Sequence, residues 1–343
     1  MDISLFREDL AYGCDTLEPF WGDVRNGRIF VTGATGFFGI WLLESFVFAN
    51  QRLKLGAELV GLSRDPEGFY AKVPHLAEES SITLLRGDVR DFDFPRGSFT
   101  HVIHAGTTSS APVPPSVMLD TIIRGTKRTL EFAVAAGVKR FLFVSSGAVY
   151  GRQPAEMTHI PESYFGAPDP MDPNSAYGEG KRVGELLCAI AHQENGLEVT
   201  IARCFAFVGP HLPLDAHFAI GNFIRDSMKG EPIKVKDGTP YRSYLYAADL
   251  AVWLWTILFR GKACYPYNVG SDQEITISQL AETVATTLGG SVASVASSAF
   301  RFNTSPSRYV SCVERARAEL GLRCQISLEE GIRKTAAWCH GLK

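Results

Sequence analysis

The segment Thr32–Gly39, with the sequence TGATGFFG, constrains the fold more than any other part of this chain. It follows the short apolar run Arg28–Val31 and precedes Ile40–Phe48, which contains neither glycine nor proline. This order predicts a β-strand, a glycine-rich turn and a helix. Free amides and the helix dipole at such a helix start attract an anion, so the segment predicts a diphosphate site.

The three glycines of this turn have different expected roles. Gly33 permits the tight bend, Gly36 lets the backbone approach a pyrophosphate, and Gly39 lets the helix pack close to the strand. The turn therefore predicts a dinucleotide-binding site. The residues expected to line it here are Gly33, Thr35, Gly36, Phe37, Phe38 and Gly39.

Short β-rich runs alternate with longer helical stretches after the turn. The later runs lie at 60–62, 82–86, 101–104, 141–145 and 199–203. Such alternation predicts an α/β fold with a doubly wound parallel sheet. We expect an N-terminal arm over 1–27, which shows no strong periodicity, and a mainly dinucleotide-binding domain over 28–204. Prolines become frequent after about 205, so 205–343 is expected to form mainly a smaller substrate lobe, interleaved with segments that return to the sheet.

Composition narrows the class of partner. The net charge of −3 gives no basis for nucleic-acid binding. Seven cysteines without a Cys-x-x-Cys pair, and eight histidines without a His-Glu-x-x-His motif, predict neither a disulfide framework nor a catalytic metal. The most apolar run, 250–259, is too short to span a bilayer and predicts a buried helix. The start of the chain shows no signal-peptide pattern, so we expect a cytoplasmic protein without a membrane segment.

The end of the second strand bears on the choice of cofactor. An acidic residue there binds the adenosine ribose of NAD, whereas a serine with a neighbouring arginine suits the 2′-phosphate of NADP. Here Ser63 and Arg64 favour NADP, while NAD stays open because Asp65 could reach the ribose instead. After the third strand, Asp88, followed by Val89, could accept a hydrogen bond from the adenine amine, although a simple turn aspartate fits equally well.

Tyr177 and Lys181 lie four residues apart in Tyr-Gly-Glu-Gly-Lys and share one face of a predicted helix. A neighbouring ammonium lowers the pKa of a phenol, which suits a general acid or base, whereas by chance the same spacing marks a solvated helix face. Ser146 ends the fifth strand and could hydrogen-bond the reacting oxygen. We prefer it to Ser145 because of its spacing to the following Val-Tyr-Gly.

Together, TGATGFFG, His-Ala-Gly at 104–106, SSGAVYG, YGEGK and a later Arg-x-Phe-x-x-x-Gly-Pro resemble the motifs of the extended short-chain dehydrogenase/reductases that act on nucleotide sugars. The resemblance covers nearly the whole chain beyond the arm. It implies a Rossmann-type fold, a nucleoside-diphosphate sugar as substrate, a homodimer through a helix bundle, and hydride transfer at carbon 4 of a hexose. By position it implies Ser146, Tyr177 and Lys181 as the catalytic residues. The cofactor site would also include His104, Ala105, Gly106, Thr107, Ser145, Tyr177 and Lys181.

The same resemblance implies substrate contacts outside the sheet. Asn222 resembles the residue that meets the nucleotide base, and Arg242 resembles the arginine that binds the diphosphate. Arg308 resembles a second such arginine, with a surface position as the alternative. Ser146 and Gly147 would adjoin the sugar. Guanidinium groups suit phosphate oxygens because they donate paired hydrogen bonds.

Departures from the family pattern reduce the number of reactions that fit this chain. Relatives that dehydrate or decarboxylate the sugar resemble one another in carrying an acid two residues after the catalytic Ser/Thr, where this chain has Ala148, preceded by Gly147. A 4,6-dehydratase or decarboxylase would therefore need atypical acid/base residues. Ile122 and Ala206 replace asparagines that are usual in relatives. A 4-epimerase and a 4-keto-sugar reductase both remain open, and a dinucleotide sensor without turnover is an alternative of another class.

Overall fold

The computed structural model of the chain describes residues 3–107, 113–216, 218–293 and 306–341. Its centre is a seven-stranded sheet in the order β10-β6-β5-β4-β1-β2-β3, in which every paired strand is parallel. This is a Rossmann-type sheet, as predicted. The strands are β1 (Arg28–Thr32), β2 (Glu58–Ser63), β3 (Ile82–Arg86), β4 (His101–His104), β5 (Arg140–Ser146), β6 (Glu198–Cys204) and β10 (Pro266–Val269).

Six of these strands match the predicted runs, and two of them, 82–86 and 101–104, match at both ends. The seventh strand, β10, had no strand signal in the sequence. It lies at the edge of the sheet and begins at Pro266, which donates no backbone hydrogen bond. An edge strand tolerates this proline. Because of the same proline, the residue pattern of β10 does not resemble that of a buried strand.

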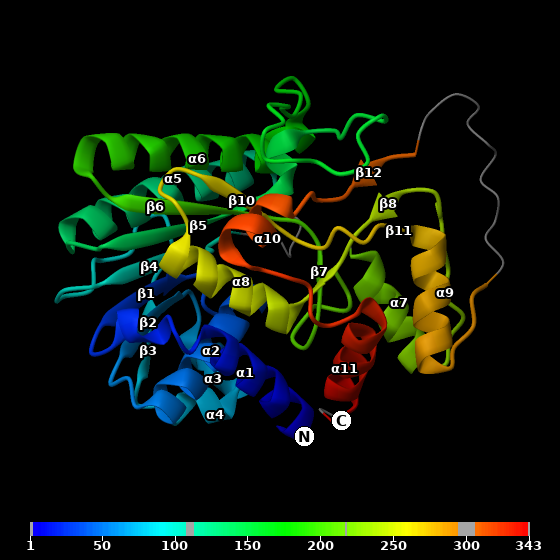
Figure 1. Cartoon of the computed structure of the whole chain (residues 1–343), viewed down its shortest axis with the longest axis horizontal. Coiled ribbons are helices and arrows are strands. Elements are labelled where there is room, and N and C mark those ends of the chain that lie inside the picture. The colour runs from blue at the N-terminus through cyan, green and yellow to red at the C-terminus, as the bar shows by residue number, and fades with distance from the viewer. Residues whose placement is uncertain (1–2, 108–112, 217, 294–305, 342–343) are drawn as a thin grey trace.

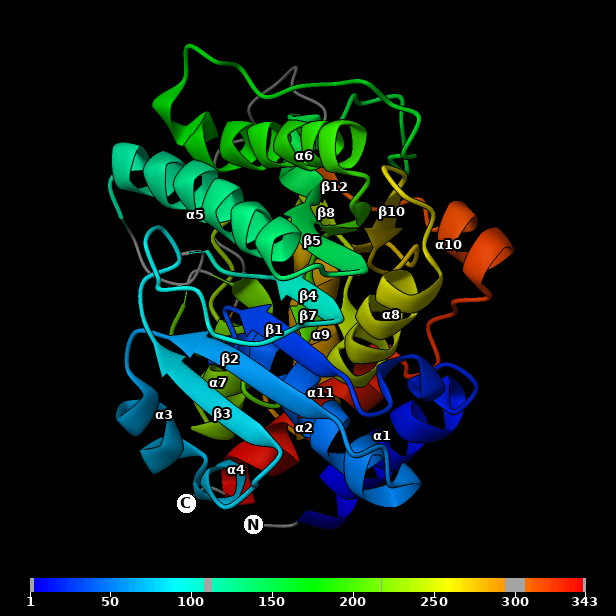
Figure 2. The ribbon, with the colours of Figure 1, turned by 90° about the vertical axis from the view of Figure 1, so that its left-hand side faces the viewer.

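Helices cover both faces of the sheet (Figure 2). The helices α5 (Pro115–Ala135) and α6 (Ala176–Asn195) lie on one face, and α2 (Phe37–Leu53) and α8 (Ala247–Arg260) lie on the other. The run 250–259 is buried within α8, as the sequence predicts. No helix in the described part of the chain is long and apolar enough to cross a bilayer. The short helices α3 (Pro66–Lys72) and α4 (Pro74–Ala77) follow β2, and α10 (Glu314–Leu320) lies near β10 (Figure 1).

A second group of elements lies beyond the carboxyl ends of the strands (Figure 1). The helices α7 (Ala219–Met228), α9 (Ile277–Leu288) and α11 (Leu328–Gly341) share one apolar core. Beside them, β8 (Tyr241–Arg242) pairs with both β11 (Ile275–Thr276) and β12 (Arg308–Tyr309), and β7 (Phe207–Val208) pairs with β9 (Leu245–Tyr246). The chain returns from this group to the sheet at α8 and β10, while the domain division at 204 stays a prediction.

The N-terminal arm forms the helix α1 (Ile3–Leu17) and the short turn η1 (Trp21–Val24). The absence of strong periodicity that we inferred from its sequence is wrong. Phe6, Leu10, Cys14 and Leu17 are buried at spacings of four, four and three residues, and they place the helix against α2 and α8.

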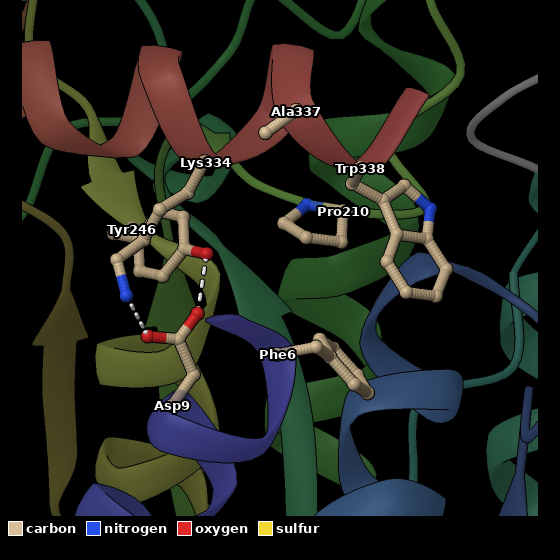
Figure 3. Close-up of a pocket in the computed structure, with 7 residues that line it drawn as sticks. All are labelled: Phe6, Asp9, Pro210, Tyr246, Lys334, Ala337 and Trp338. Atoms are coloured by element: carbon tan, nitrogen blue, oxygen red, sulfur yellow. Dashed lines mark hydrogen bonds and ion pairs between the residues drawn. The ribbon is translucent and has the colours of Figure 1, made fainter. Parts of the chain in front are cut away.

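Figure 3 shows the contacts between this arm and the C-terminal helix. The Asp9 carboxylate accepts hydrogen bonds from the Tyr246 hydroxyl at 2.6 Å and from the Lys334 ammonium at 2.5 Å. Phe6 and Trp338 pack beside them with ring centroids 5.0 Å apart. The cavity between these residues has a volume of about 10 Å³, enough for one water molecule at most. We therefore interpret this cluster as structural.

The glycine turn after β1 is packed against neighbouring backbone. Gly33 has a φ of +71°, and a Cβ at this position would lie 2.6 Å from the carbonyl oxygen of Ala105. A Cβ on Gly39 would lie 2.3 Å from the carbonyl oxygens of Gly33 and Ala34. The predicted reasons for these two glycines, a tight bend and close helix packing, are therefore confirmed.

We predict that Gly39→Ala destabilises the protein by about 1–3 kcal/mol, because the added methyl group meets backbone that cannot move without shifting α2. Gly22→Ala is the matched control, since a Cβ there meets nothing within 4 Å; its change should stay within about 0.5 kcal/mol. Urea unfolding of both variants measures the difference. Equal stabilities of the two variants would contradict the close-packing argument.

Candidate functional site

The sheet order changes direction between β1 and β4, and in an open parallel sheet the ligand-binding crevice lies at the carboxyl ends of the strands at such a point. The helix α2 begins there with Gly36 as its N-cap, and no side chain caps it. Gly36 is exposed, and a Cβ on it would meet nothing closer than 3.4 Å. An open helix N-terminus with room in front of it suits a diphosphate.

One further observation agrees with a dinucleotide at this point, and a second shows how Phe38 is packed. The Oγ1 atom of Thr107, just after β4, is buried without a hydrogen-bond partner among the described residues. Phe38, in the first turn of α2, packs edge-on against Phe207 of β7 with ring centroids 5.0 Å apart. The residues present therefore fit the diphosphate of a dinucleotide.

The side chain of His104, the last residue of β4, is buried beside this crevice. Its side chain is 1% exposed, its Nδ1 lies 2.6 Å from Thr32 Oγ1, and its ring stacks on Phe143. Thr32 Oγ1 in turn accepts a hydrogen bond from Gly106 N at 3.0 Å. Burial lowers the pKa of His104 to about 3, so the ring is neutral. The side chain therefore positions the Gly106 backbone, and the predicted contact of residue 104 with a cofactor would have to come from its backbone.

A cavity of about 420 Å³ lies beside the end of β2. Ser63, Arg64 and Thr35 line it at the sheet, and Lys72 and His75 line it from α3 and α4. The His75 imidazole lies 2.6 Å from Glu44, and this hydrogen bond raises the pKa of His75. Several cationic groups therefore face this cavity.

Asp65 lines the same cavity but is already engaged. Its carboxylate caps α3 by accepting a hydrogen bond from Gly68 N at 3.1 Å, and its own amide donates to Ser63 Oγ at 3.1 Å. The alternative in which Asp65 binds a ribose has to compete with this cap.

Asp88 follows β3 and binds Arg90 through both carboxylate oxygens, at 2.9 and 3.1 Å. The hydrogen bond from Arg90 holds the pKa of Asp88 below its usual range. Val89, the next residue, lies against Gly106 and Gly125, so that a Cβ on either glycine would approach the Val89 methyl groups to 2.9–3.1 Å. The structure thus places 88–89 beside the β4 end of the crevice, and their predicted contact with adenine stays a prediction.

The structure brings Ser146, Tyr177 and Lys181 together. Ser146 ends β5, and its Oγ accepts a hydrogen bond from Ala148 N at 3.1 Å and lies close enough to the Tyr177 phenol to lower the pKa of that phenol. Lys181, one turn further along α6, is 2% exposed and donates from Nζ to the carbonyl oxygen of Val144 at 2.7 Å.

The predicted effect of Lys181 on Tyr177 is wrong for the protein alone. Burial raises the pKa of Tyr177 to about 12, and the hydrogen bond with Ser146 offsets only part of this rise. The ammonium of Lys181 is itself buried, which lowers its pKa to about 8. The loss of water around each group is therefore the largest cause of its pKa shift.

The glycines of α6 have a packing reason. A Cβ on Gly178 would lie 2.7 Å from the Ala148 carbonyl oxygen, and one on Gly184 would lie 2.5 Å from the Phe143 ring. A Cβ on Gly180 would meet Ile122 of α5 at 3.1 Å. Ile122 thus presents an apolar surface to the helix that carries Tyr177.

Ser145 faces a different group. Its hydroxyl donates to Glu185 at 2.6 Å, and Glu185 accepts two hydrogen bonds from Arg203, at 2.9 and 2.6 Å. Ser145 is thus engaged in a buried network, and the choice of Ser146 for the reacting oxygen fits this arrangement. Within the described ranges, no three His, Cys, Asp or Glu side chains form a group that could hold a metal ion.

The predicted substrate residues lie on the smaller group of elements. Asn222 is on α7, where its Oδ1 accepts a hydrogen bond from Arg225 at 3.1 Å. Arg242 on β8 donates to the Tyr241 carbonyl oxygen at 2.7 Å. Arg308 forms an ion pair with Glu274, and its guanidinium lies 3.9 Å from the Tyr241 ring centroid. Arg308 is therefore not a free surface arginine, and a diphosphate would have to compete with Glu274 for it.

Sequence reasoning missed Tyr309. This residue lies on β12 opposite Arg242 of β8, and its hydroxyl is 3.5 Å from Ser146 Oγ. Its ring packs against Phe205 with centroids 4.7 Å apart. Only its place next to Arg308 marked it in the sequence, because the pairing of two two-residue strands sets its position.

Comparison with known proteins gives a family match over most of this region. Residues 29–270 match the model of the NAD dependent epimerase/dehydratase family. UDP-glucuronic acid decarboxylase 1 of Arabidopsis thaliana is 31% identical over 89% of this chain and 68% of its own length. UDP-glucuronic acid decarboxylase 1 of Xenopus tropicalis is 29% identical over 92% of this chain and 73% of its own length.

Solved structures agree on the fold. A dTDP-glucose 4,6-dehydratase from Streptomyces venezuelae, crystallised with NAD bound, has 26% identity and a TM-score of 0.76 over 92% of this chain and 97% of that one. A UDP-glucuronic acid 4-epimerase from Bacillus cereus in complex with NAD has 22% identity and a TM-score of 0.75 over 92% and 99% of the two chains.

The buried ammonium of Lys181 predicts a pH-dependent stability. Its pKa lies near 8 in the folded chain and near its ordinary 10.5 when unfolded, so the unfolded chain binds the extra proton between these values. The penalty is full below pH 8 and disappears as the pH rises to 10.5. The unfolding free energy of the wild type minus that of Lys181→Met should therefore rise by up to about 3 kcal/mol over this range.

Urea unfolding at a series of pH values measures this difference. The exposed Lys127→Met serves as the control, and its difference from the wild type should stay flat. A wild-type minus Lys181→Met difference that falls or stays level with rising pH would contradict the burial of a charged lysine.

Proposed function

Because the chain belongs to the NAD-dependent epimerase/dehydratase family, and is an enzyme of that family, we propose that it transfers hydride reversibly at carbon 4 of a nucleoside-diphosphate hexose. The observation that carries this proposal is the group of Ser146, Tyr177 and Lys181 at the end of β5, with no titratable side chain at 147 or 148. Such a site supplies one proton-transfer group for one oxygen atom, which is what hydride transfer at a carbinol carbon requires.

The chain's own residues divide this task. A nicotinamide dinucleotide held at the glycine turn would supply the hydride acceptor or donor. Tyr177 takes the proton of the sugar hydroxyl when the C–H bond breaks, and returns it to the carbonyl oxygen in the reverse direction. Ser146 hydrogen-bonds the same oxygen, while Lys181 holds α6 to the Val144 carbonyl and thereby fixes Tyr177. Arg242 supports binding of the diphosphate from β8.

We propose NADP as the preferred dinucleotide. Ser63 lies at the end of β2, and Arg64, Lys72 and His75 face the adjoining cavity of about 420 Å³. A 2′-phosphate carries about two negative charges that such groups neutralise, whereas an NAD ribose has none. This preference favours the 4-keto reductase over the 4-epimerase, since a reductase consumes a reduced cofactor in every turnover.

Decarboxylation is the second candidate, and the similarity to UDP-glucuronic acid decarboxylases favours it. Oxidation at carbon 4 of a uronic acid places a ketone β to the carboxylate, so the same triad could start that reaction. Gly147 and Ala148 argue against it, because neither can supply a second acid or base.

We also propose the homodimer that the family resemblance implies. Four apolar side chains on α5 and α6 support it, since they are 39–60% exposed on the outer face of this helix pair. They are Val117, Val134, Leu186 and Ile190.

Tyr177→Phe should reduce kcat by about 10²–10⁴-fold, because the phenol is the proton-transfer group, while dinucleotide affinity stays unchanged. The measurement offers several nucleotide sugars, including 4-keto forms and UDP-glucuronic acid, and follows NADPH absorbance, carbon-4 epimers and carbon dioxide. Net NADPH oxidation identifies the reductase, interconversion without net oxidation the epimerase, and carbon dioxide the decarboxylase.

Tyr164→Phe is the matched control, because it removes a phenol oxygen from the neighbouring aromatic cluster without touching Ser146. Its turnover should equal that of the wild type. A wild type that binds dinucleotide but converts none of these sugars would support the sensor and overturn the enzyme activity proposed here.

Arg64→Ala should weaken NADPH binding by about 10–100-fold and leave NADH binding nearly unchanged, since a charge-assisted contact contributes about 1.5–3 kcal/mol. Fluorescence titration with both dinucleotides measures the ratio. Lys229→Ala, an exposed lysine on another surface, is the control for the lost charge. An equal loss for the two dinucleotides would contradict the preference for NADP.

A further inference from the structure

Tyr309 joins the catalytic group from the opposite side of the crevice. Its hydroxyl lies 3.5 Å from Ser146 Oγ and 3.4 Å from the carbonyl oxygen of Cys204, which ends β6. Both distances are long for hydrogen bonds between oxygens, as is common at catalytic sites before a ligand is bound. The ring of Phe205 packs against the Tyr309 ring and holds it in this place.

The missing side chain at position 147 makes this approach possible. A Cβ on Gly147 would lie 2.8 Å from the Tyr309 hydroxyl and 2.8 Å from the Phe205 ring. Any larger residue at 147 would therefore displace the phenol from Ser146. The absence of a side chain at position 147 thus makes room for a second tyrosine beside Ser146.

Counting donors fixes the direction of the hydrogen bonds. Ser146 Oγ already accepts from Ala148 N at 3.1 Å, so it has one acceptor position and one proton left. A neutral Tyr177 hydroxyl that closes on the neighbouring Ser146 donates to it, so that Ser146 donates to Tyr309 and Tyr309 donates to the Cys204 carbonyl. Every hydroxyl in this chain then has a partner.

Loss of the Tyr177 proton requires the opposite direction. Ser146 now donates to the phenolate, and the acceptor position on Ser146 that faced Tyr177 is freed. Tyr309 can turn its proton from the Cys204 carbonyl to Ser146, which strengthens the hydrogen bond that Ser146 gives to the phenolate.

We propose that Tyr309 is a positioning residue that acts through Ser146, supplying the hydrogen bond that lets Ser146 stabilise the Tyr177 phenolate. Its effect on turnover rests on the function proposed above, whereas its effect on the ionisation of Tyr177 does not. The proton stays on Tyr309 throughout, so the change of hydrogen bonds adds no proton transfer to the hydride-transfer step.

Two other polar groups lie near Tyr177. Cys204 faces it from β6, and burial keeps this thiol protonated by raising its pKa. Lys181, on the same helix, gives a hydrogen bond to Val144. Arg242 of β8 acts on Tyr309 and lowers its pKa, but burial has the larger effect and raises it, so Tyr309 remains a donor.

The test compares Tyr309→Phe with Tyr164→Phe as the matched loss of a phenol oxygen in the same aromatic cluster. A fluorinated tyrosine is placed at position 177, because its lower intrinsic pKa brings ionisation into the range where the protein is folded, and fluorine NMR follows the titration. Tyr309→Phe should raise the pKa at position 177 by about one unit, a tenfold change in proton affinity. Tyr164→Phe should leave it unchanged.

Gly147→Ala gives a second, independent variant, since its methyl group displaces the Tyr309 hydroxyl, and it should shift the pKa in the same direction. In turnover, Tyr309→Phe should move the pH dependence of kcat by the same amount with little change in KM. An unchanged pKa at position 177, or a raised KM with an unchanged pH profile, would overturn the proposal. If the wild type converts no nucleotide sugar, the proposed function fails while the NMR titration still decides the role of Tyr309.

Discussion

The close packing of α6 on β5 is the contact on which the rest of the site depends. Gly184 brings the helix so near the strand that a single methyl group would meet the Phe143 ring at 2.5 Å. At this separation the Lys181 side chain reaches the Val144 carbonyl oxygen, at 2.7 Å, directly beneath the strand end. Tyr177 then lies in the first turn of the helix, beside Ser146, which ends the strand. A larger distance between α6 and β5 would move both the phenol and the ammonium away from the serine.

The order of the elements explains why the crevice has two unlike walls. The sheet contributes Ser146 and the end of β6, while the small sheet β11-β8-β12 contributes Arg242 and Tyr309. The chain leaves the main sheet after β6 and comes back at β10, so neither wall is a separate downstream unit. Phe205, the first residue after β6, packs on Tyr309 and joins the two walls at the catalytic group.

The sequence predicts the elements whose signal is local. The glycine turn and six strands of the main sheet follow from residues that are neighbours in the chain, and the structure confirms them. Where pairing decides, local patterns are insufficient: β10 is held by β6 despite Pro266, and Tyr309 is placed by its pairing with β8. His104 shows a related limit, because its neighbours along the chain do not reveal that Thr32 binds its ring.

The ionisation of Tyr177 shows why burial has to be known before charge is interpreted. Two residues four apart on a helix suggest that a cation stabilises a phenolate. Here burial raises the pKa of Tyr177 to about 12 and lowers that of Lys181 to about 8. Both changes oppose the charged pair, so a phenolate at this site depends on hydrogen-bond donors that need no water. Ser146 is one such donor in direct reach, and its capacity is set by the group that hydrogen-bonds to it in turn.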